Sequence, residues 1–219
     1  HVTMLDGTSF LIFQDAQTKG RKVATMFTGF CSYHDKVLFQ EIEDIDFTAT
    51  QKQIFLLTYR TMAWHYHKKQ EQAKQNELLI QQMTEHGFTL KRNREKNLFL
   101  RGLELGLSDN ETKKTEFDQA LINSDYEKVH SRIWELPYEV QFAVSMQFEP
   151  SFDLHGNQLG DYLNDEECLR SIYLNIFPVQ GKSFCIWSWL SADDSIFSPF
   201  AEQFMALDIV DRKNFLNNK

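Results

Sequence analysis

The sequence predicts an α+β protein, and three changes of residue pattern along the chain support this. The first 47 residues combine apolar runs with a cysteine and a histidine that lie close together. Apolar residues then recur with helical spacing, and no proline occurs between Phe47 and Leu136. From Val140 onward apolar and polar residues alternate, as in a half-buried strand. We therefore divide the chain into segments 1–47, 48–130 and 131–219, and expect the last two to form one compact unit.

Composition and charge narrow the class of protein. The hydrophobic content of 42% in 219 residues fits a globular chain. A net charge of −8 argues against a protein that binds nucleic acid over its whole surface. No apolar run reaches membrane-spanning length, and the three cysteines form no disulfide-framework pattern. We expect a cytoplasmic protein with no membrane partner.

The N-terminal segment predicts a β-hairpin followed by a helix. Residues 9–14 and 23–27 are apolar and are predicted strands, and the polar stretch 15–22 is the predicted turn between them. After the second strand come Gly29 and the run from Cys31 to Asp35, and then a short amphipathic helix that carries Leu38, Phe39 and Ile42. Hairpin, knuckle and helix in this order is the layout of a treble-clef zinc finger. The same layout also occurs in α+β domains without metal.

The middle of the chain predicts three helices. Thr48 to Gln51 fits a capping box, and the helix that follows should bury Phe55, Tyr59 and Met62 before it ends at Gly87. Residues 90–107 predict a second helix. A second capping box at Ser108 to Glu111 opens the predicted third helix, with Phe117, Leu121 and Ile122 facing inward.

The last segment predicts an antiparallel sheet with a covering helix. Residues 140–148 alternate and form the first predicted strand, and 150–165 form a loop. Residues 172–177 and 183–190 predict two further strands, joined by a hairpin connection over 178–182 that contains a glycine. Trp187 and Trp189 share one side of the last strand with Cys185, which suggests a core or interface cluster. A closing helix follows with Phe197, Phe200 and Phe204 on one face.

Cys31 and His34 are the candidate metal ligands. They are separated by two residues, a spacing at which a tight turn can direct a sulfur and an imidazole at one zinc ion, and Asp35 can orient the histidine. A structural zinc normally takes four ligands. The others would come from His1, Cys168, Cys185 or residues upstream, although Cys168 and Cys185 are more typical of core cysteines.

Two other interpretations of the pair remain open. In the first, Cys31 is a buried hairpin residue and His34 an unrelated surface residue. In the second, Cys31 is a nucleophile and His34 its base, which the short spacing disfavours. His65 and His67 point in nearly opposite directions on a helix and do not form a metal pair.

Charged residues outside the knuckle predict one ion pair and one basic surface. Arg60 lies near the apolar face of the first long helix, so we expect a carboxylate partner from Glu41 or Glu43, in a scaffold role. The basic cluster consists of Lys91, Arg92, Arg94 and Lys96. Its default interpretation is a solvated helix face, and the alternative is a set of phosphate contacts with salt-dependent binding.

One stretch resembles a known type of protein. The stretch comprises Thr25-Met-Phe-Thr-Gly-Phe-Cys31, His34-Asp35, Leu38-Phe39 and Ile42-Glu43. It is similar to a group of uncharacterised bacterial proteins that look like a diverged HNH-type treble clef. The resemblance covers about the first fifty residues and implies a zinc cofactor, together with nucleic-acid cleavage or a role in phage defence.

The chain departs from the HNH pattern in two respects. No first pair of ligands precedes the hairpin, and the Asp-His or Glu-His dipeptide that would supply the nuclease base is absent. Catalytic residues are therefore not identified. The sequence leaves two hypotheses: a zinc-knuckle, HNH-like protein that acts on or near nucleic acid, as a metal-dependent nuclease if it is an enzyme, and a non-enzymatic module that binds a partner protein and holds at most a structural metal.

Overall fold

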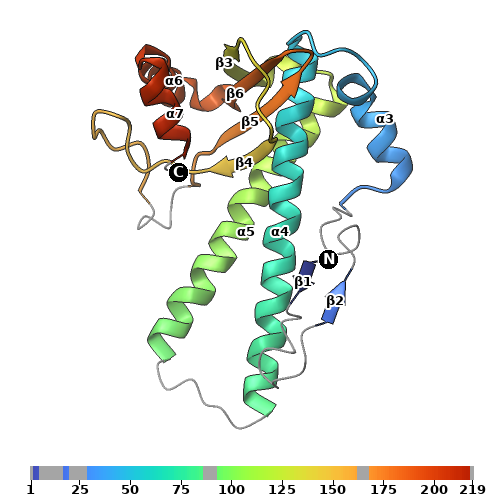
Figure 1. Cartoon of the computed structure of the whole chain (residues 1–219). Helices are drawn as coiled ribbons and strands as arrows, with labels where there is room; N and C mark the ends of the chain where they lie inside the picture. The colour runs from blue at the N-terminus through green and yellow to red at the C-terminus, as the bar shows by residue number, and fades with distance from the viewer. Residues whose placement is uncertain (1, 5–16, 20–28, 86–92, 162–167, 218–219) are drawn as a thin grey trace. The chain divides into compact units, whose positions relative to one another are not determined.

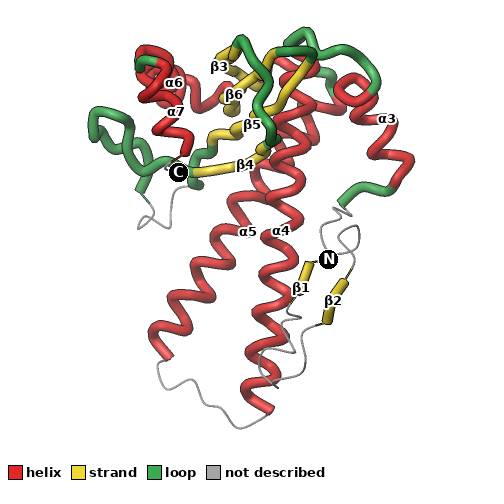
Figure 2. Tube along the Cα trace, in the orientation of Figure 1, coloured by secondary structure: helices red, strands yellow, loops and turns green. Residues whose placement is uncertain are grey.

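The computed structural model confirms the α+β class (Figures 1 and 2). It describes residues 2–4, 17–19, 29–85, 93–161 and 168–217. The chain divides into two compact units, His1–Asp35 with Trp64–Glu111 and Lys36–Ala63 with Thr112–Lys219. Among the described helices, none has an apolar stretch long enough to cross a membrane.

The first unit contains a short antiparallel pair of strands. Strand β1 (Val2–Met4) pairs with β2 (Gln17–Lys19), Val2 opposite Lys19. Strand β2 lies inside 15–22, so the prediction of a turn over that whole stretch was wrong. Pairing uses the backbone amide and carbonyl groups, and polar side chains do not prevent it. The predicted strands 9–14 and 23–27 lie outside the described residues.

Helix α3 (Ser32–Glu43) confirms the predicted helix after the knuckle. Phe39 is fully buried, and Leu38 and Ile42 are half-buried. The three side chains lie on one helix face, which is the face that α3 packs against the second unit's core.

Helix α4 (Gln51–Glu85) begins two residues later than the sequence pattern suggests. The backbone N–H of Gln53 donates to Thr50 Oγ1 at 3.2 Å, and the N–H of Thr50 donates to Gln53 Oε1 at 3.3 Å. The capping box is therefore Thr50 to Gln53, and the predicted box at Thr48 was wrong. Ala49 has a φ of 57°, which redirects the chain just before the helix. Two overlapping Thr-x-x-Gln patterns exist here, and the tertiary contacts of Gln53 select the second.

Gln53 also connects α4 to the end of α3. Its side-chain amide donates to the carbonyl oxygens of Glu41 at 3.2 Å and Asp46 at 2.9 Å. The side chain is 1% exposed. A single buried amide thus accepts from donors at the start of one helix and donates to two carbonyl groups, one in the last turn of the other helix and one just after it.

The second and third predicted helices are one helix, α5 (Asn93–Ile122). The Ser108 pattern does not open a helix, because nothing before it interrupts the helical hydrogen bonds. Gly106 lies beside α4 instead, where a Cβ atom would be 3.6 Å from Lys69 Nζ. Phe117 is buried as predicted and Leu121 is half-buried, but Ile122 is 81% exposed because α5 ends there.

The second unit contains a four-stranded antiparallel sheet. Its strands are β3 (Val129–Leu136), β4 (Val144–Phe148), β5 (Ile172–Val179) and β6 (Lys182–Leu190), in the order β3-β6-β5-β4. Strand β3 was not predicted, and the predicted strand 140–148 is a strand only from Val144. The predicted β5–β6 hairpin is present. It turns at Gln180 and Gly181, whose φ values of 47° and 86° are those of a two-residue primed turn.

One face of the sheet packs on helices α6 (Asp194–Ala206) and α7 (Ile209–Asn217). Cys185, Trp187 and Trp189 point to this face and are at most 1% exposed, which confirms the predicted aromatic cluster. The Trp187 ring stacks on Phe204 at 4.5 Å between centroids. Helix α6 is the predicted closing helix, and α7 was not predicted.

The opposite face of the sheet packs on the first half of α4 and the last turns of α5. Thr58 Oγ1 lies 2.8 Å from Ser188 Oγ, and Thr61 Oγ1 donates to Asn175 Oδ1 at 3.0 Å. The Phe117 ring meets the Tyr173 ring edge-on at 5.5 Å. The second unit is therefore a three-layer arrangement, with one largely apolar and one partly polar interface (Figure 1).

The position of the α4 cap can be tested with two threonine variants. Thr50→Ala removes the side chain that caps the helix, and we expect it to lower the free energy of unfolding by about 1 kcal/mol. Thr48→Ala removes only a 3.4 Å contact to Gln53 and should have a clearly smaller effect. Urea denaturation measures both. A larger effect of Thr48→Ala would contradict the cap that we describe.

Candidate functional site

Cys31 and His34 lie together at the start of α3. Cys31 directly precedes the helix, and its carbonyl oxygen accepts the N–H of Asp35 at 2.9 Å. This turn brings Cys31 Sγ to 3.2 Å from His34 Nδ1, and both residues are exposed. Two ligands of one tetrahedral zinc ion lie about 3.5 Å apart when one is sulfur and the other nitrogen. The separation of 3.2 Å is that of a hydrogen bond between a thiol and an imidazole, and it is also close to the separation of two ligands of one zinc ion.

The other two cysteines belong to the second unit, whereas this pair belongs to the first. Cys185 is fully buried in the sheet core, and burial raises the pKa of its thiol to about 12, so it remains protonated. Cys168 is exposed, so its prediction as a core cysteine was wrong. It precedes β5, where the chain runs over the surface before it enters the sheet. His1 lies outside the described residues. Within those residues, no group of three or more His, Cys, Asp or Glu side chains is placed to hold a metal.

The residues expected to support the knuckle lie along α3 and α4. Asp35 is in the first turn of α3, where the helix dipole favours a carboxylate. Arg60 Nη1 lies 2.8 Å from Glu43 Oε1, so the predicted ion pair is present, and its guanidinium lies 4.9 Å from the centre of the Phe39 ring. Glu41, the other predicted partner, pairs with Lys52 at 2.9 Å instead. These contacts hold α3 against α4, which is a scaffold role.

The predicted phosphate contacts are not described by the structure. Lys91 and Arg92 lie outside the described residues. Arg94 and Lys96 belong to α5, but their side chains lie outside the described part. A role of these four residues in phosphate binding stays a prediction.

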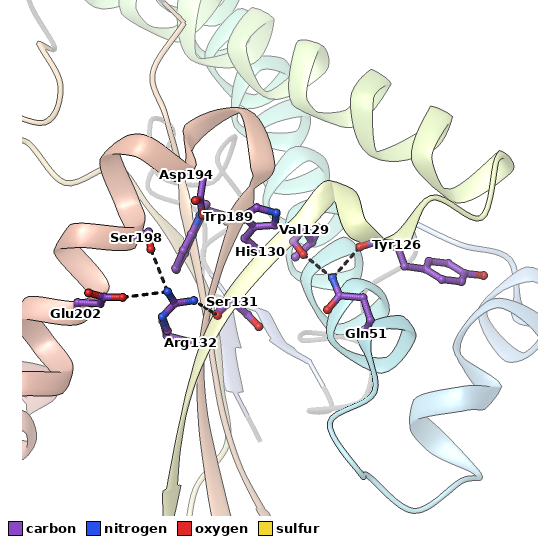
Figure 3. Close-up of polar contacts among 10 residues, drawn as sticks. All are labelled: Gln51, Tyr126, Val129, His130, Ser131, Arg132, Trp189, Asp194, Ser198 and Glu202. Atoms are coloured by element: carbon purple, nitrogen blue, oxygen red, sulfur yellow. Dashed lines mark hydrogen bonds and ion pairs between the residues drawn. The ribbon is translucent and has the colours of Figure 1, made fainter.

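A polar cluster that the sequence did not predict lies on β3 and α6 (Figure 3). His130 Nδ1 is 2.6 Å from Asp194 Oδ1, and Trp189 Nε1 donates to the same oxygen at 3.0 Å. The hydrogen bond with His130 is the main reason why the pKa of the Asp194 carboxyl lies below its usual range. The carboxylate fixes the orientation of the imidazole, as in histidine–aspartate pairs that transfer protons.

Next to this pair, Arg132 reaches from β3 to α6. Its guanidinium donates to Ser198 Oγ at 3.1 Å, to Glu202 Oε1 at 3.0 Å and to the carbonyl oxygen of Ser131 at 3.1 Å (Figure 3). Through its contacts with Ser198 and Glu202, the arginine connects helix α6 to β3, an edge strand of the sheet. The cluster joins residues more than sixty positions apart, so no local spacing in the sequence could have indicated it.

A pocket of about 350 Å³ opens in the second unit. The ionisable and polar side chains that line it include Lys113, Glu116, Cys168, Arg170, Tyr173 and Asp193. Lys113 is only 5% exposed, and its Nζ donates to Ser171 Oγ at 2.6 Å. Burial raises the pKa of Asp193, and the nearby Arg170, 3.3 Å away, lowers it in part.

Comparisons with protein-family models, with curated proteins and with solved structures found no match to this chain. The functional interpretation therefore depends on the chemistry of these three places. The knuckle provides a sulfur and an imidazole that lie close together, the β3–α6 cluster provides an oriented histidine, and the pocket provides charged groups of both signs, of which Lys113 is buried.

The His130–Asp194 pair has a measurable pH dependence. Because folding lowers the pKa of Asp194, the stabilisation is present at neutral pH and is lost as the pH falls below the usual value of 3.8. We expect Asp194→Asn to be less stable than the wild type by less than about 1 kcal/mol at neutral pH, since both side chains are about 40% exposed. Denaturation as a function of pH measures this. Asp211→Asn, at an exposed position of α7, serves as the control, and a difference that persists at low pH would contradict the assignment.

Proposed function

We propose that Cys31 and His34 are two of the ligands of a structural zinc ion, and that this HNH-like knuckle lets the protein act on or near nucleic acid. The observation that carries the proposal is the 3.2 Å separation of Cys31 Sγ and His34 Nδ1 at an exposed helix start. A simple packing role for this pair would not require both side chains to face solvent. Zinc binding does not require burial of the ligands before the metal arrives.

The described residues provide half of such a site. Two more ligands would have to come from residues outside the described part or from a second molecule, and the resemblance to HNH proteins supports this division into two ligand pairs. With zinc bound, the ion would supply a crosslink between α3 and the segment that carries the other pair. Cys31 would bind as a thiolate, and His34 would bind through a neutral imidazole.

The proposed nucleic-acid contact rests on the basic residues Lys91, Arg92, Arg94 and Lys96. With a net charge of −8, the protein would have to use a local basic surface and not its whole surface. Cleavage would further require an open coordination position and a general base. Asp35 is the carboxylate next to the pair in the sequence. A role in phage defence is supported by the resemblance alone.

A second candidate function is a module that binds a partner protein. The observation that favours it is the exposure of Tyr33 and Val37, which are 69% and 58% exposed and lie four positions apart on α3. Such a pair lies on one helix face, and exposed aromatic and aliphatic side chains on one face are typical of a helix that binds in a partner's groove. In this case any metal would only stabilise the start of α3.

The zinc proposal predicts the metal content of the purified protein. We expect close to one zinc per chain in the wild type, measured by atomic emission, and the absence of most of it in both Cys31→Ser and His34→Ala. Replacement of zinc by cobalt should give a sulfur-to-metal charge-transfer band that Cys31→Ser abolishes.

Matched controls separate this site from adventitious binding. Cys168→Ser and His155→Ala remove an exposed cysteine and an exposed histidine elsewhere in the chain, and should retain the zinc. A folded wild-type protein that binds no zinc when the metal is supplied would contradict the proposal. An equal decrease of zinc in the control variants would assign the metal to another place.

The nucleic-acid part predicts a salt-dependent affinity for DNA or RNA. Changing Lys91, Arg92, Arg94 and Lys96 together to alanine should weaken binding and lower the slope of log K against log salt by about one for each phosphate that the variant no longer binds. Lys128→Ala with Lys182→Ala is the control, since both are surface residues of the second unit. Fluorescence anisotropy with labelled oligonucleotides measures the slopes. Binding that does not depend on these four residues would favour the partner-protein module.

A further inference from the structure

The hydroxyl of Tyr173 is a buried polar group that has no hydrogen-bond partner among the described residues. Tyr173 is 0% exposed, and its hydroxyl makes no hydrogen bond in the described part of the chain. Buried hydroxyls in native proteins are nearly always hydrogen-bonded, because an unmade bond costs free energy. Tyr59, by comparison, is also buried, and its hydroxyl donates to Asp118 Oδ1 at 2.7 Å. Tyr173 therefore differs from Tyr59, and it lines the pocket of the second unit.

The same pocket is lined by a buried lysine that can donate further hydrogen bonds. Lys113 has three N–H donors. One goes to Ser171 Oγ at 2.6 Å, and the nearest carboxylate oxygen, from Glu149, is 3.7 Å from Nζ. That carboxylate oxygen also accepts Ser171 Oγ and Gln147 Nε2, each at 2.9 Å. The ammonium and the phenol thus give the pocket a place for a hydrogen-bond acceptor, which a carboxylate fits best.

The pocket is also lined by negatively charged groups. The carboxylates of Glu116 and Asp193 line the pocket. Asp193 forms an ion pair with Arg170, whose Nε lies 3.3 Å from Asp193 Oδ1. A ligand with a carboxylate alone would be repelled by these two acidic groups, and a cation alone would leave the phenol without an acceptor and would be repelled by the lysine. Leu169 and Leu190 provide apolar wall between the charged groups. The volume of about 350 Å³ lies at the lower end for small-molecule sites.

We propose that this pocket binds a small zwitterion of the amino-acid class, with its carboxylate at Tyr173 and Lys113 and its ammonium group facing Asp193 and Glu116. This inference is independent of the zinc knuckle, since every residue involved belongs to the second unit. The ligand supplies the acceptor that the Tyr173 hydroxyl lacks.

The first test is a binding screen with the full chain. Isothermal calorimetry and thermal-shift measurements use the common L-amino acids as probes. For the best ligand, two analogues follow: the acid without the amino group and the amine without the carboxylate, which for leucine are 4-methylpentanoate and 3-methylbutylamine. We expect at least one amino acid to bind and each analogue to bind at least tenfold more weakly. No binding at millimolar concentration, or equal binding of either analogue, would overturn the proposal.

The second test uses paired tyrosine variants. Tyr173→Phe should weaken binding of the best amino acid at least tenfold, while the ligand-free variant keeps or gains stability because the unpaired hydroxyl is gone. Tyr59→Phe, which removes a hydroxyl that has a partner, should lose stability and keep the affinity. Lys113→Met provides a second disruption of the carboxylate site. Unchanged affinity in Tyr173→Phe would show that its hydroxyl does not contact the ligand.

Discussion

The second unit depends on strand β6. It pairs along both edges, with Val129–Leu136 of β3 on one side and with β5 on the other. Its side chains are buried on both faces, so Trp187 and Trp189 contact the α6 layer while Ile186 and Ser188 contact the α4 layer. Strand β6 lies between two other strands and between two helical layers, so its register determines which of its side chains contact each layer.

The two faces of the sheet are held by different forces. Apolar burial dominates on the α6 side, where aromatic rings stack and the free energy grows with the area removed from water. On the α4 side, Thr58 with Ser188 and Thr61 with Asn175 form buried hydrogen bonds. Such bonds add little net stability, but an unmatched partner would be costly, so they select one placement of the helix on the sheet. On this face of the sheet, the Tyr173 hydroxyl and the Asn175 amide nitrogen have no partner among the described residues, and our amino-acid proposal gives the Tyr173 exception a functional explanation.

Helix α3 links the knuckle residues to a fixed scaffold. Its C-terminal half is held by the buried amide of Gln53, by the Lys52–Glu41 pair and by the Arg60–Glu43 pair. At the start of the helix, Cys31 and His34 are exposed. An exposed pair at the start of a helix whose C-terminal half is held in place is the arrangement that our zinc proposal requires.

The sequence left the partner of Arg60 open between Glu41 and Glu43, and packing selected Glu43. The sequence alone determined the α+β class, helix α3, the β5–β6 hairpin and the buried face of α6. These features depend on short-range periodicity or on turn residues, and both can be recognised within a short stretch of the sequence. Tertiary structure decided the start of α4 at Thr50, the continuity of α5 through Ser108 and the burial of Lys113. It also decided that His130 pairs with Asp194. Each of these depends on partners far apart in the chain, so a local pattern permits several outcomes and packing selects one of them.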